Sequence, residues 1–142
     1  MRLPHIAASL LALSLSAPAQ ELSVGAAAVD VTPDYPVRLS GFGFRRTESE
    51  GVTLKIWAKA LAIDGGTGRP AVVITVDNLG IPISMTRDVA ARLQQKAKLD
   101  PTRLAITASH THTAPMLTNV CPTLFGVPIP PEHQAHIDRS EY

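Results

Sequence analysis

The sequence predicts an α/β fold in which one mixed sheet combines a β-hairpin with a βαβ unit. Three observations predict this fold class. A segment in which apolar residues alternate with other residues, 52–64, is joined by a Gly-rich turn to an apolar run, 71–77. An amphipathic segment, 84–98, follows that run. A second short apolar run, 103–108, comes next, so the last three elements have the order strand, helix, strand.

Each strand has its own sequence pattern. The segment 22–33 predicts the first strand, because its residues are small and apolar and Pro33 ends it. The segment 52–64 predicts a strand with one buried face, since small apolar residues alternate with residues such as Lys59. The run 71–77 is apolar almost throughout, which is typical of a strand buried on both faces.

The helix prediction rests on its ends and on its apolar stripe. Ser84 is the expected N-cap of helix 84–98, in which an apolar residue recurs at every fourth position. Pro101 disfavours helical backbone at the residue before it. A crossover helix joins parallel strands, so we expect 71–77 and 103–108 to be parallel.

Polar residues follow both strands of the predicted βαβ unit. Asp77 ends the first strand, and Ser109-His110-Thr111-His112 follows the second. In a parallel sheet the carboxyl ends of the strands lie at one edge, where ligands collect. Two histidines at positions i and i+2 lie on the same side of an extended segment, and imidazole is the commonest metal-binding side chain. His110 and His112 can therefore face one metal ion or one substrate, or they are ordinary polar residues of a loop.

A closed zinc site needs more ligands than these two histidines provide. His133 and His136 are spaced i and i+3, which does not match the His-Glu-x-x-His zinc motif. We expect both to be solvated surface residues. The single cysteine, Cys121, excludes an internal disulfide bond and is expected to be a small buried residue.

Residues 1–19 have the pattern of a secretory signal peptide. Arg2 precedes an apolar run, and Ala17-Pro18-Ala19 is a typical cleavage site. The apolar run is too short to span a bilayer, so we expect no transmembrane anchor and a secreted or periplasmic protein. The formal net charge of +1 and the lack of basic residues interleaved with aromatic ones give no indication of nucleic-acid binding.

Five segments, in this order, resemble the N-terminal domain of the neutral/alkaline non-lysosomal ceramidase family. They are VGAAAVDVTP, GFGF, GVTLKIWAKALAI, VVITVDNLG and ITASHTHTAP. The last resembles the family's S/G-T-H-T-H-S-x-P-G motif. Its position after the other four makes it the most specific of the five.

The resemblance implies that residues 20–142 are the truncated N-terminal part of a zinc-dependent amidohydrolase. The reaction is hydrolysis of the N-acyl amide bond of ceramide, or of a related lipid amide, to a sphingoid base and a fatty acid. The resemblance also implies that His110 is a zinc (Zn2+) ligand and that His112 is a catalytic residue at the reacting centre. We expect the carboxylate of Asp77 to orient His110 through its second ring nitrogen.

The resemblance places the remaining zinc ligands (a second His, a Glu and a Tyr) and a catalytic Ser further along the chain. We therefore expect 20–142 to be an incomplete domain that is inactive alone.

Other classes of metal-dependent hydrolase also contain a His-x-His pattern. In metallo-β-lactamases the second histidine is followed by Asp and His, whereas Thr113-Ala114-Pro115 follows here. TIM-barrel amidohydrolases have their His-x-His after the first strand, whereas several predicted elements precede it here. A non-catalytic exported binding module, an inactive remnant, and a metal-dependent hydrolase of another amide or ester remain alternatives.

Overall fold

The computed structural model describes residues 21–124 and 126–141. The predicted signal peptide, 1–19, lies outside these residues. The elements are β1 (Ser23–Asp30), β2 (Trp57–Asp64), β3 (Ala71–Val76), α1 (Ile83–Ala97), η1 (Pro101–Arg103), β4 (Leu104–Ala108), η2 (Pro122–Leu124) and α2 (Pro131–Arg139). Within the described residues, no helix combines the length and the apolar character that crossing a bilayer requires.

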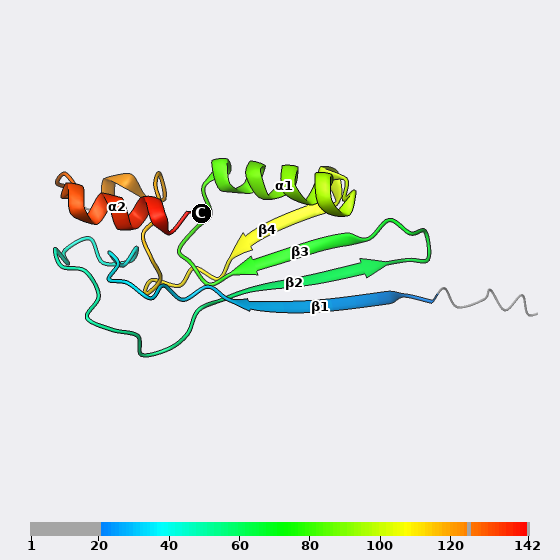
Figure 1. The fold of residues 1–142 in the computed structure, drawn as a ribbon, viewed down its shortest axis with the longest axis horizontal. Coiled ribbons are helices and arrows are strands. Elements are labelled where there is room, and N and C mark those ends of the chain that lie inside the picture. Colours follow the sequence, from blue (N-terminus) through cyan, green and yellow to red (C-terminus); the bar gives the residue numbers. More distant parts are fainter. Residues whose placement is uncertain (1–20, 125, 142) are drawn as a thin grey trace, which may run out of the picture.

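The four strands form one mixed sheet in the order β1-β2-β3-β4 (Figure 1). The pairs β1–β2 and β2–β3 are antiparallel, and β3–β4 is parallel with Val76 opposite Ala108. This confirms the predicted mixed sheet, the hairpin and the parallel βαβ pair. The carboxyl ends of β3 and β4 lie at the same edge, and both arrows in Figure 1 point toward the end of the molecule where α2 lies.

The second strand is shorter than the sequence predicts, because β2 begins at Trp57 rather than at residue 52. Its partner β1 ends at Asp30, which lies opposite Trp57. One further backbone hydrogen bond, from the Val31 amide to the Ile56 carbonyl (3.0 Å), follows this pair, and residues 52–55 then form a loop with no strand beside them. Alternation alone predicted strand there, but a strand also needs a neighbour for its backbone hydrogen bonds.

The start of α1 also differs from the prediction. The N-cap is Pro82, with extended backbone angles (φ −64°, ψ 148°), and Ser84 lies inside the helix. The carbonyl of Pro82 accepts the amide of Thr86, and no side chain caps this end. The helix ends at Ala97 because Lys98 adopts the left-handed conformation (φ 56°).

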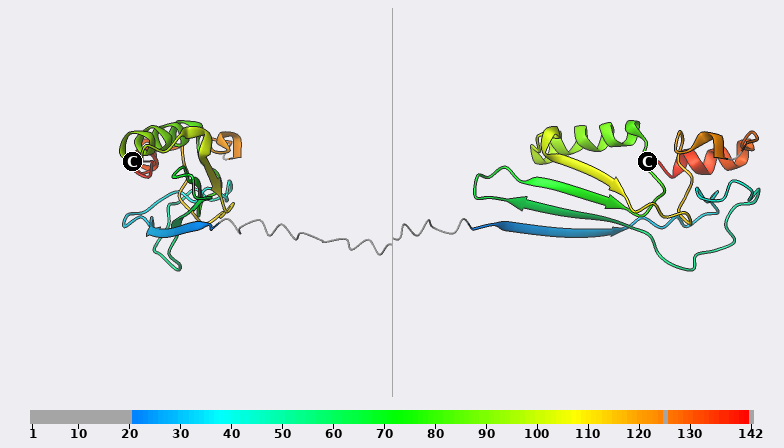
Figure 2. Two further views of the ribbon diagram at one scale, coloured as in Figure 1. Left: turned by 90° about the vertical axis from the view of Figure 1, so that its right-hand side faces the viewer. Right: turned by 180° about the vertical axis from the view of Figure 1, so that it is seen from behind.

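One face of the sheet is only partly covered, and the other is open. In Figure 2, α1 lies alongside the β3–β4 half of the sheet and away from β1. Every residue of β1 is exposed, and in β3 the side chain of Val73 is 42% exposed, while Ile74, on the opposite face, is half-buried. The expectation that 71–77 is buried on both faces is therefore wrong for the described residues, since nothing in them covers the second face.

The best-packed part of the molecule lies next to the carboxyl ends of the parallel strands. Leu79, Leu117 and Val120 form one buried cluster, against which Met85 of α1 packs. A second cluster joins two buried residues from different segments, Met116 and Ile137 of α2, and the half-buried Ile129 packs against it. Cys121, expected to be buried, is instead exposed, in a turn with φ 51°. The segments that carry the predicted site are thus the best-packed segments among the described residues.

Candidate functional site

The histidine segment continues the parallel pairing of β3 and β4. The amide of Ser109 donates to the carbonyl of Val76 (3.0 Å), and the amide of Thr111 donates to the carbonyl of Asn78 (3.0 Å). Between these two bonds His110 has a φ of 63°, in the left-handed region that few residues other than glycine adopt. The segment is therefore held by backbone hydrogen bonds on both sides of a sharp local turn.

The rings of His110 and His112 lie side by side. Their centroids are 5.1 Å apart with an angle of 71° between the ring planes, and both residues are exposed. Phe42 approaches His112 from the loop that follows β1, with centroids 6.3 Å apart. The structure thus brings the two predicted histidines together at the surface, at the edge where β3 and β4 end.

Both histidines have the same ring nitrogen next to a backbone carbonyl. Nδ1 of His110 lies 3.1 Å from the Leu79 oxygen, and Nδ1 of His112 lies 3.3 Å from the Gly41 oxygen. A carbonyl oxygen only accepts hydrogen bonds, so each Nδ1 must carry the proton. In the neutral rings, Nε2 is then left with its lone pair. This is the arrangement by which proteins fix the tautomer of a metal-binding or proton-accepting histidine.

Asp77 lies at the same edge but is paired with a different residue. Its Oδ2 accepts the amide of Trp57 (3.0 Å), and its own amide donates to the Trp57 carbonyl (2.9 Å). Among the described residues, Leu79 and not Asp77 takes the position next to Nδ1 of His110. The two reciprocal bonds extend the β2–β3 pairing by one residue beyond Val76, and an orienting role for Asp77 toward His110 stays a prediction.

The sequence alone did not single out Gly41 as part of the site. Its amide donates to the carbonyl of His112 (3.0 Å), while its own carbonyl holds the ring of the same residue. A Cβ atom at this position would overlap Cβ, Cγ and Nδ1 of His112. The Gly-Phe-Gly-Phe segment indicates an unusual backbone conformation. No pattern within the segment indicates that His112 packs against it.

Asn78 is the second residue that the sequence did not single out. It is 5% exposed, its Nδ2 donates to the Pro115 carbonyl (3.1 Å), and its Oδ1 accepts the amide of Leu79 (2.7 Å). It therefore links the segment that holds His110 to the segment that follows His112. The sequence did contain a signal for Asn78, because it is a polar residue close after an apolar strand.

A cavity of about 1160 Å³ lies next to this segment. Asp77, Thr111 and Thr113 line it, together with the loops 32–39 and 49–56. Neither histidine is among its lining residues. The cavity therefore adjoins the two threonines and not the imidazole rings.

The sequence predicts that His133 and His136 are solvated surface residues, but the structure gives both of them side-chain partners. His133 and His136 are half-buried on α2. Nδ1 of His136 lies 2.8 Å from Oε1 of Glu48, and Nδ1 of His133 lies 3.4 Å from Nη1 of Arg38. Both histidines are half-buried because α2 packs on the loop after β1, and no local sequence pattern encodes that packing.

The described residues contain no group of three or more His, Cys, Asp and Glu side chains placed to hold a metal ion. His110 and His112 therefore present two nitrogen donors, and a closed site would take further ligands from elsewhere. Two imidazoles with fixed tautomers can bind one side of an open metal centre or exchange protons with a substrate.

Comparison with known proteins gives structural neighbours only. No protein-family model matches the chain, and no curated protein matches it. A solved structure of neutral ceramidase from Pseudomonas aeruginosa matches with a TM-score of 0.58 and 26% identity, covering 67% of this chain and 16% of that chain. A ceramidase complexed with C2 matches with a TM-score of 0.58 and 24% identity, covering 67% of this chain and 15% of that chain.

These matches support a ceramidase-like relationship for the fold. The chain spans about one sixth of the length of the structures it resembles.

Proposed function

We propose that this chain is the N-terminal part of an exported, zinc-dependent amidohydrolase of ceramidase type. The substrate class is ceramide or a related lipid amide, cleaved at its N-acyl bond to a sphingoid base and a fatty acid. The observation that carries the proposal is the pairing of His110 and His112. Their rings lie 5.1 Å apart, each Nδ1 is held by a backbone carbonyl, and each Nε2 is available.

The residues present suit an open zinc site in part. His110 would hold the ion through Nε2, with the Leu79 carbonyl fixing its ring. A bound zinc ion lowers the pKa of a bound water to about 7 and polarises a substrate carbonyl. Further ligands must come from residues other than this pair.

His112 would act on protons at the reacting centre. In its neutral form Nε2 accepts a proton, and in its protonated form Nε2–H donates a hydrogen bond to an oxygen that gains negative charge. The Gly41 carbonyl keeps Nδ1 out of this exchange. General acid–base catalysis of this kind contributes typically ~10²–10⁴-fold to a rate.

Two further points support the proposal. The sequence motifs occur in the family's order, with His-Thr-His last, and the fold matches two ceramidase structures over 67% of the chain. The position of the histidines beyond the carboxyl ends of parallel strands is the usual position of a ligand site in such a sheet.

Zinc binding to the purified chain tests the first half of the proposal. Isothermal titration compares the wild type with His110→Ala, and with His133→Ala as a matched histidine control on α2. We expect His110→Ala to weaken zinc binding by more than about tenfold, as losing a direct ligand should. The control should keep the wild-type affinity. Equal affinities for the wild type and His110→Ala would overturn the proposed ligand.

Hydrolysis tests the second half, on the longest polypeptide that the gene encodes. A fluorescent N-acyl sphingosine and the matching O-acyl ester are supplied in parallel. Release from the amide that depends on zinc and is lost in both His110→Ala and His112→Ala supports a lipid amidase. Release from the ester alone would indicate a hydrolase of another class.

A non-catalytic binding module is the second candidate. It is favoured by the lack of a third metal-binding side chain near the two histidines among the described residues. Zinc binding through His110 without turnover of either substrate would support it.

A further inference from the structure

The residues 37–49 form a loop that is closed at its base. The amide of Ser49 donates to the Val37 carbonyl (2.8 Å), and the amide of Val37 donates to Oγ of Ser49 (3.1 Å). A compact surface loop whose ends meet in this way is an Ω-loop. We refer to residues 37–49 as the Ω-loop.

The Ω-loop is attached to the histidine segment along its first half. The amide of Ser40 donates to the Ala114 carbonyl (3.0 Å), and that of Gly41 donates to the His112 carbonyl (3.0 Å). Leu39 and Pro115 form an isolated antiparallel bridge. The shape of the loop therefore decides where the Gly41 carbonyl lies relative to the ring of His112.

The side chain of Arg38 is enclosed by the Ω-loop. Arg38 is 2% exposed, its Nη2 donates to the Arg45 carbonyl (2.9 Å), and its Nη1 donates to the Arg46 carbonyl (3.0 Å). A planar guanidinium can bond two successive carbonyls at once, which the single ammonium of lysine does less well. Arg38 thus joins the beginning of the loop to its far side.

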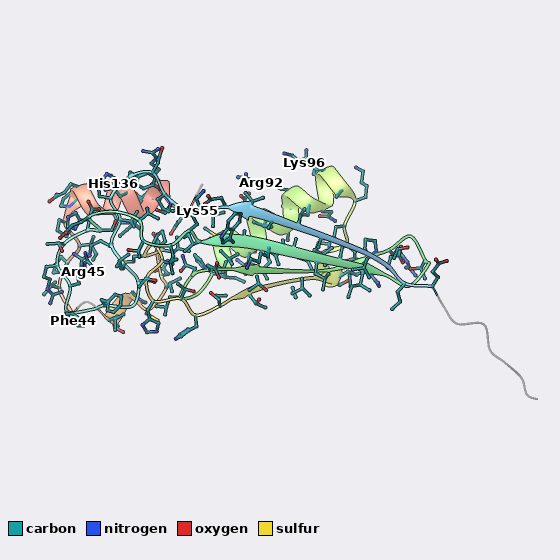
Figure 3. The ribbon with its side chains drawn as sticks, turned by 90° about the horizontal axis from the view of Figure 1, so that it is seen from below. Phe44, Arg45, Lys55, Arg92, Lys96 and His136 are labelled. Carbon is teal, nitrogen blue, oxygen red and sulfur yellow. The ribbon has the colours of Figure 1, made fainter. Side chains whose placement is uncertain are left out.

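Helix α2 supports the Ω-loop from outside. Nδ1 of His133 lies 3.4 Å from Nη1 of Arg38, and Nδ1 of His136 lies 2.8 Å from Oε1 of Glu48. In Figure 3, Arg45 and His136 lie at the same end of the molecule. Burial lowers the pKa of Arg38, the neighbouring charge of Arg46 lowers it further, and Glu48 opposes both. An arginine nevertheless stays protonated.

We propose that Arg38 is a positioning residue for His112. It keeps the Ω-loop closed, the closed loop keeps the Gly41 carbonyl at Nδ1 of His112, and that hydrogen bond keeps Nε2 free to accept a proton. The catalytic value of this arrangement rests on the proposed function. The chain of contacts from Arg38 to His112 does not depend on the proposed function.

The test is the tautomer of each histidine in the metal-free chain, measured by ¹⁵N-edited NMR at about pH 8.5, where histidine is mostly neutral. In the wild type we expect the Nδ1–H form to predominate at both His110 and His112. In Arg38→Lys we expect the ratio of Nδ1–H to Nε2–H at His112 to fall roughly two- to tenfold, the equivalent of one net hydrogen bond.

His110 is the control within the same spectrum, because the Leu79 carbonyl holds it from a different loop. A merely structural loss of stability would change both histidines, whereas loss of positioning changes His112 alone. Arg92→Lys on α1, where Arg92 pairs with Asp88 at the surface, should change neither.

A milder variant covers the case in which Arg38→Lys does not fold. Ser49→Ala removes the Oγ that accepts the Val37 amide and so weakens the base of the Ω-loop, while the backbone bond from the Ser49 amide to the Val37 carbonyl remains. It should shift His112 in the same direction by a smaller factor. An unchanged His112 tautomer in a folded variant of either kind overturns the proposal. If His112 responds as expected but the chain binds no zinc, the proposed function fails and this inference stands.

Discussion

The carbonyl oxygen of Gly41 lies 3.3 Å from Nδ1 of His112, although the two residues are 71 positions apart in the sequence. The amide of Gly41 also donates to the carbonyl of His112. The loop after β1 therefore fixes the backbone and the ring of the same histidine. The proposed catalytic residue owes its orientation to an element far from its own strand.

Replacing Gly41 by alanine should disrupt this contact. The added Cβ would overlap Cβ of His112, which cannot move without its backbone. We expect Gly41→Ala to lower the free energy of unfolding by about 1–3 kcal/mol, as overpacking typically does. Urea denaturation measures the change. Gly25→Ala is the matched control, because a Cβ there meets nothing within 4 Å. Equal effects of the two substitutions would contradict the close approach.

Asn78→Ala should destabilise the edge of the sheet that carries the histidines. The variant leaves the Leu79 amide and the Pro115 carbonyl without the side-chain partners they have now. Buried groups that lose a hydrogen-bond partner cost about 1–3 kcal/mol. Thermal and urea unfolding should show this loss, whereas Gln95→Ala on the exposed face of α1 should change stability by less than about 0.5 kcal/mol. A neutral Asn78→Ala would refute the linking role of Asn78.

Asp30 should make stability depend on pH in the acid range. Hydrogen bonds from Lys55 and then Thr32 lower the pKa of Asp30 from 3.8 to about 2. A carboxylate with a lowered pKa in the folded state stabilises the fold above its ordinary pKa, and this contribution is lost as the pH falls through about 2. Lys55 lies close to the end of β1 in Figure 3, with Nζ 2.7 Å from Oδ2 of Asp30.

Melting curves of the wild type and Asp30→Asn between about pH 6 and pH 2 test this dependence. The difference in melting temperature between the two proteins should be largest near neutral pH. It should shrink as the pH falls below 3.8, the ordinary pKa of Asp30, toward about 2. Lys55→Met should reduce the difference only in part, because the hydrogen bonds from Thr32 remain. If the difference in melting temperature is the same at every pH, the charge of Asp30 does not contribute to stability.

Ile137→Ala tests whether α2 is held in place by packing. Ile137 is 2% exposed and packs with Met116 in a cluster that includes Ile129. Truncating a buried isoleucine to alanine typically costs about 2–5 kcal/mol. Ile83→Ala on α1, where the side chain is 64% exposed, should cost less than about 0.5 kcal/mol. Chemical denaturation of the two variants should separate them clearly.

The elements that the sequence predicted well are those with strong local patterns. Alternation in Trp57–Asp64, the apolar runs of β3 and β4 and the helical period of α1 each follow from residues within one element. The order strand, helix, strand then required parallel pairing, which brought Asp77 and the two histidines to one edge of the sheet. Local periodicity and one topological rule were enough for this.

Most of the errors have a common cause, since they concern contacts between distant residues. The start of α1, with Pro82 and not Ser84 as the N-cap, is a local exception. The strand pattern at 52–55 has no strand beside it, because β1 ends at Asp30 and its continuation pairs only as far as Ile56. The burial of the second face of β3 and of Cys121 depends on which distant segments pack over them. His136 was expected in solvent but lies against Glu48, 88 positions away.

The sequence by itself determined the fold class, the edge of the sheet at which the polar residues gather, and the His-x-His pattern that points to metal or acid–base chemistry. Only the tertiary structure decided which nitrogen of each histidine is free. That choice depends on the carbonyls of Gly41 and Leu79, which belong to two separate loops. A loop carbonyl has the same chemistry at every residue, so its position, and therefore its effect, exists only once the chain has folded.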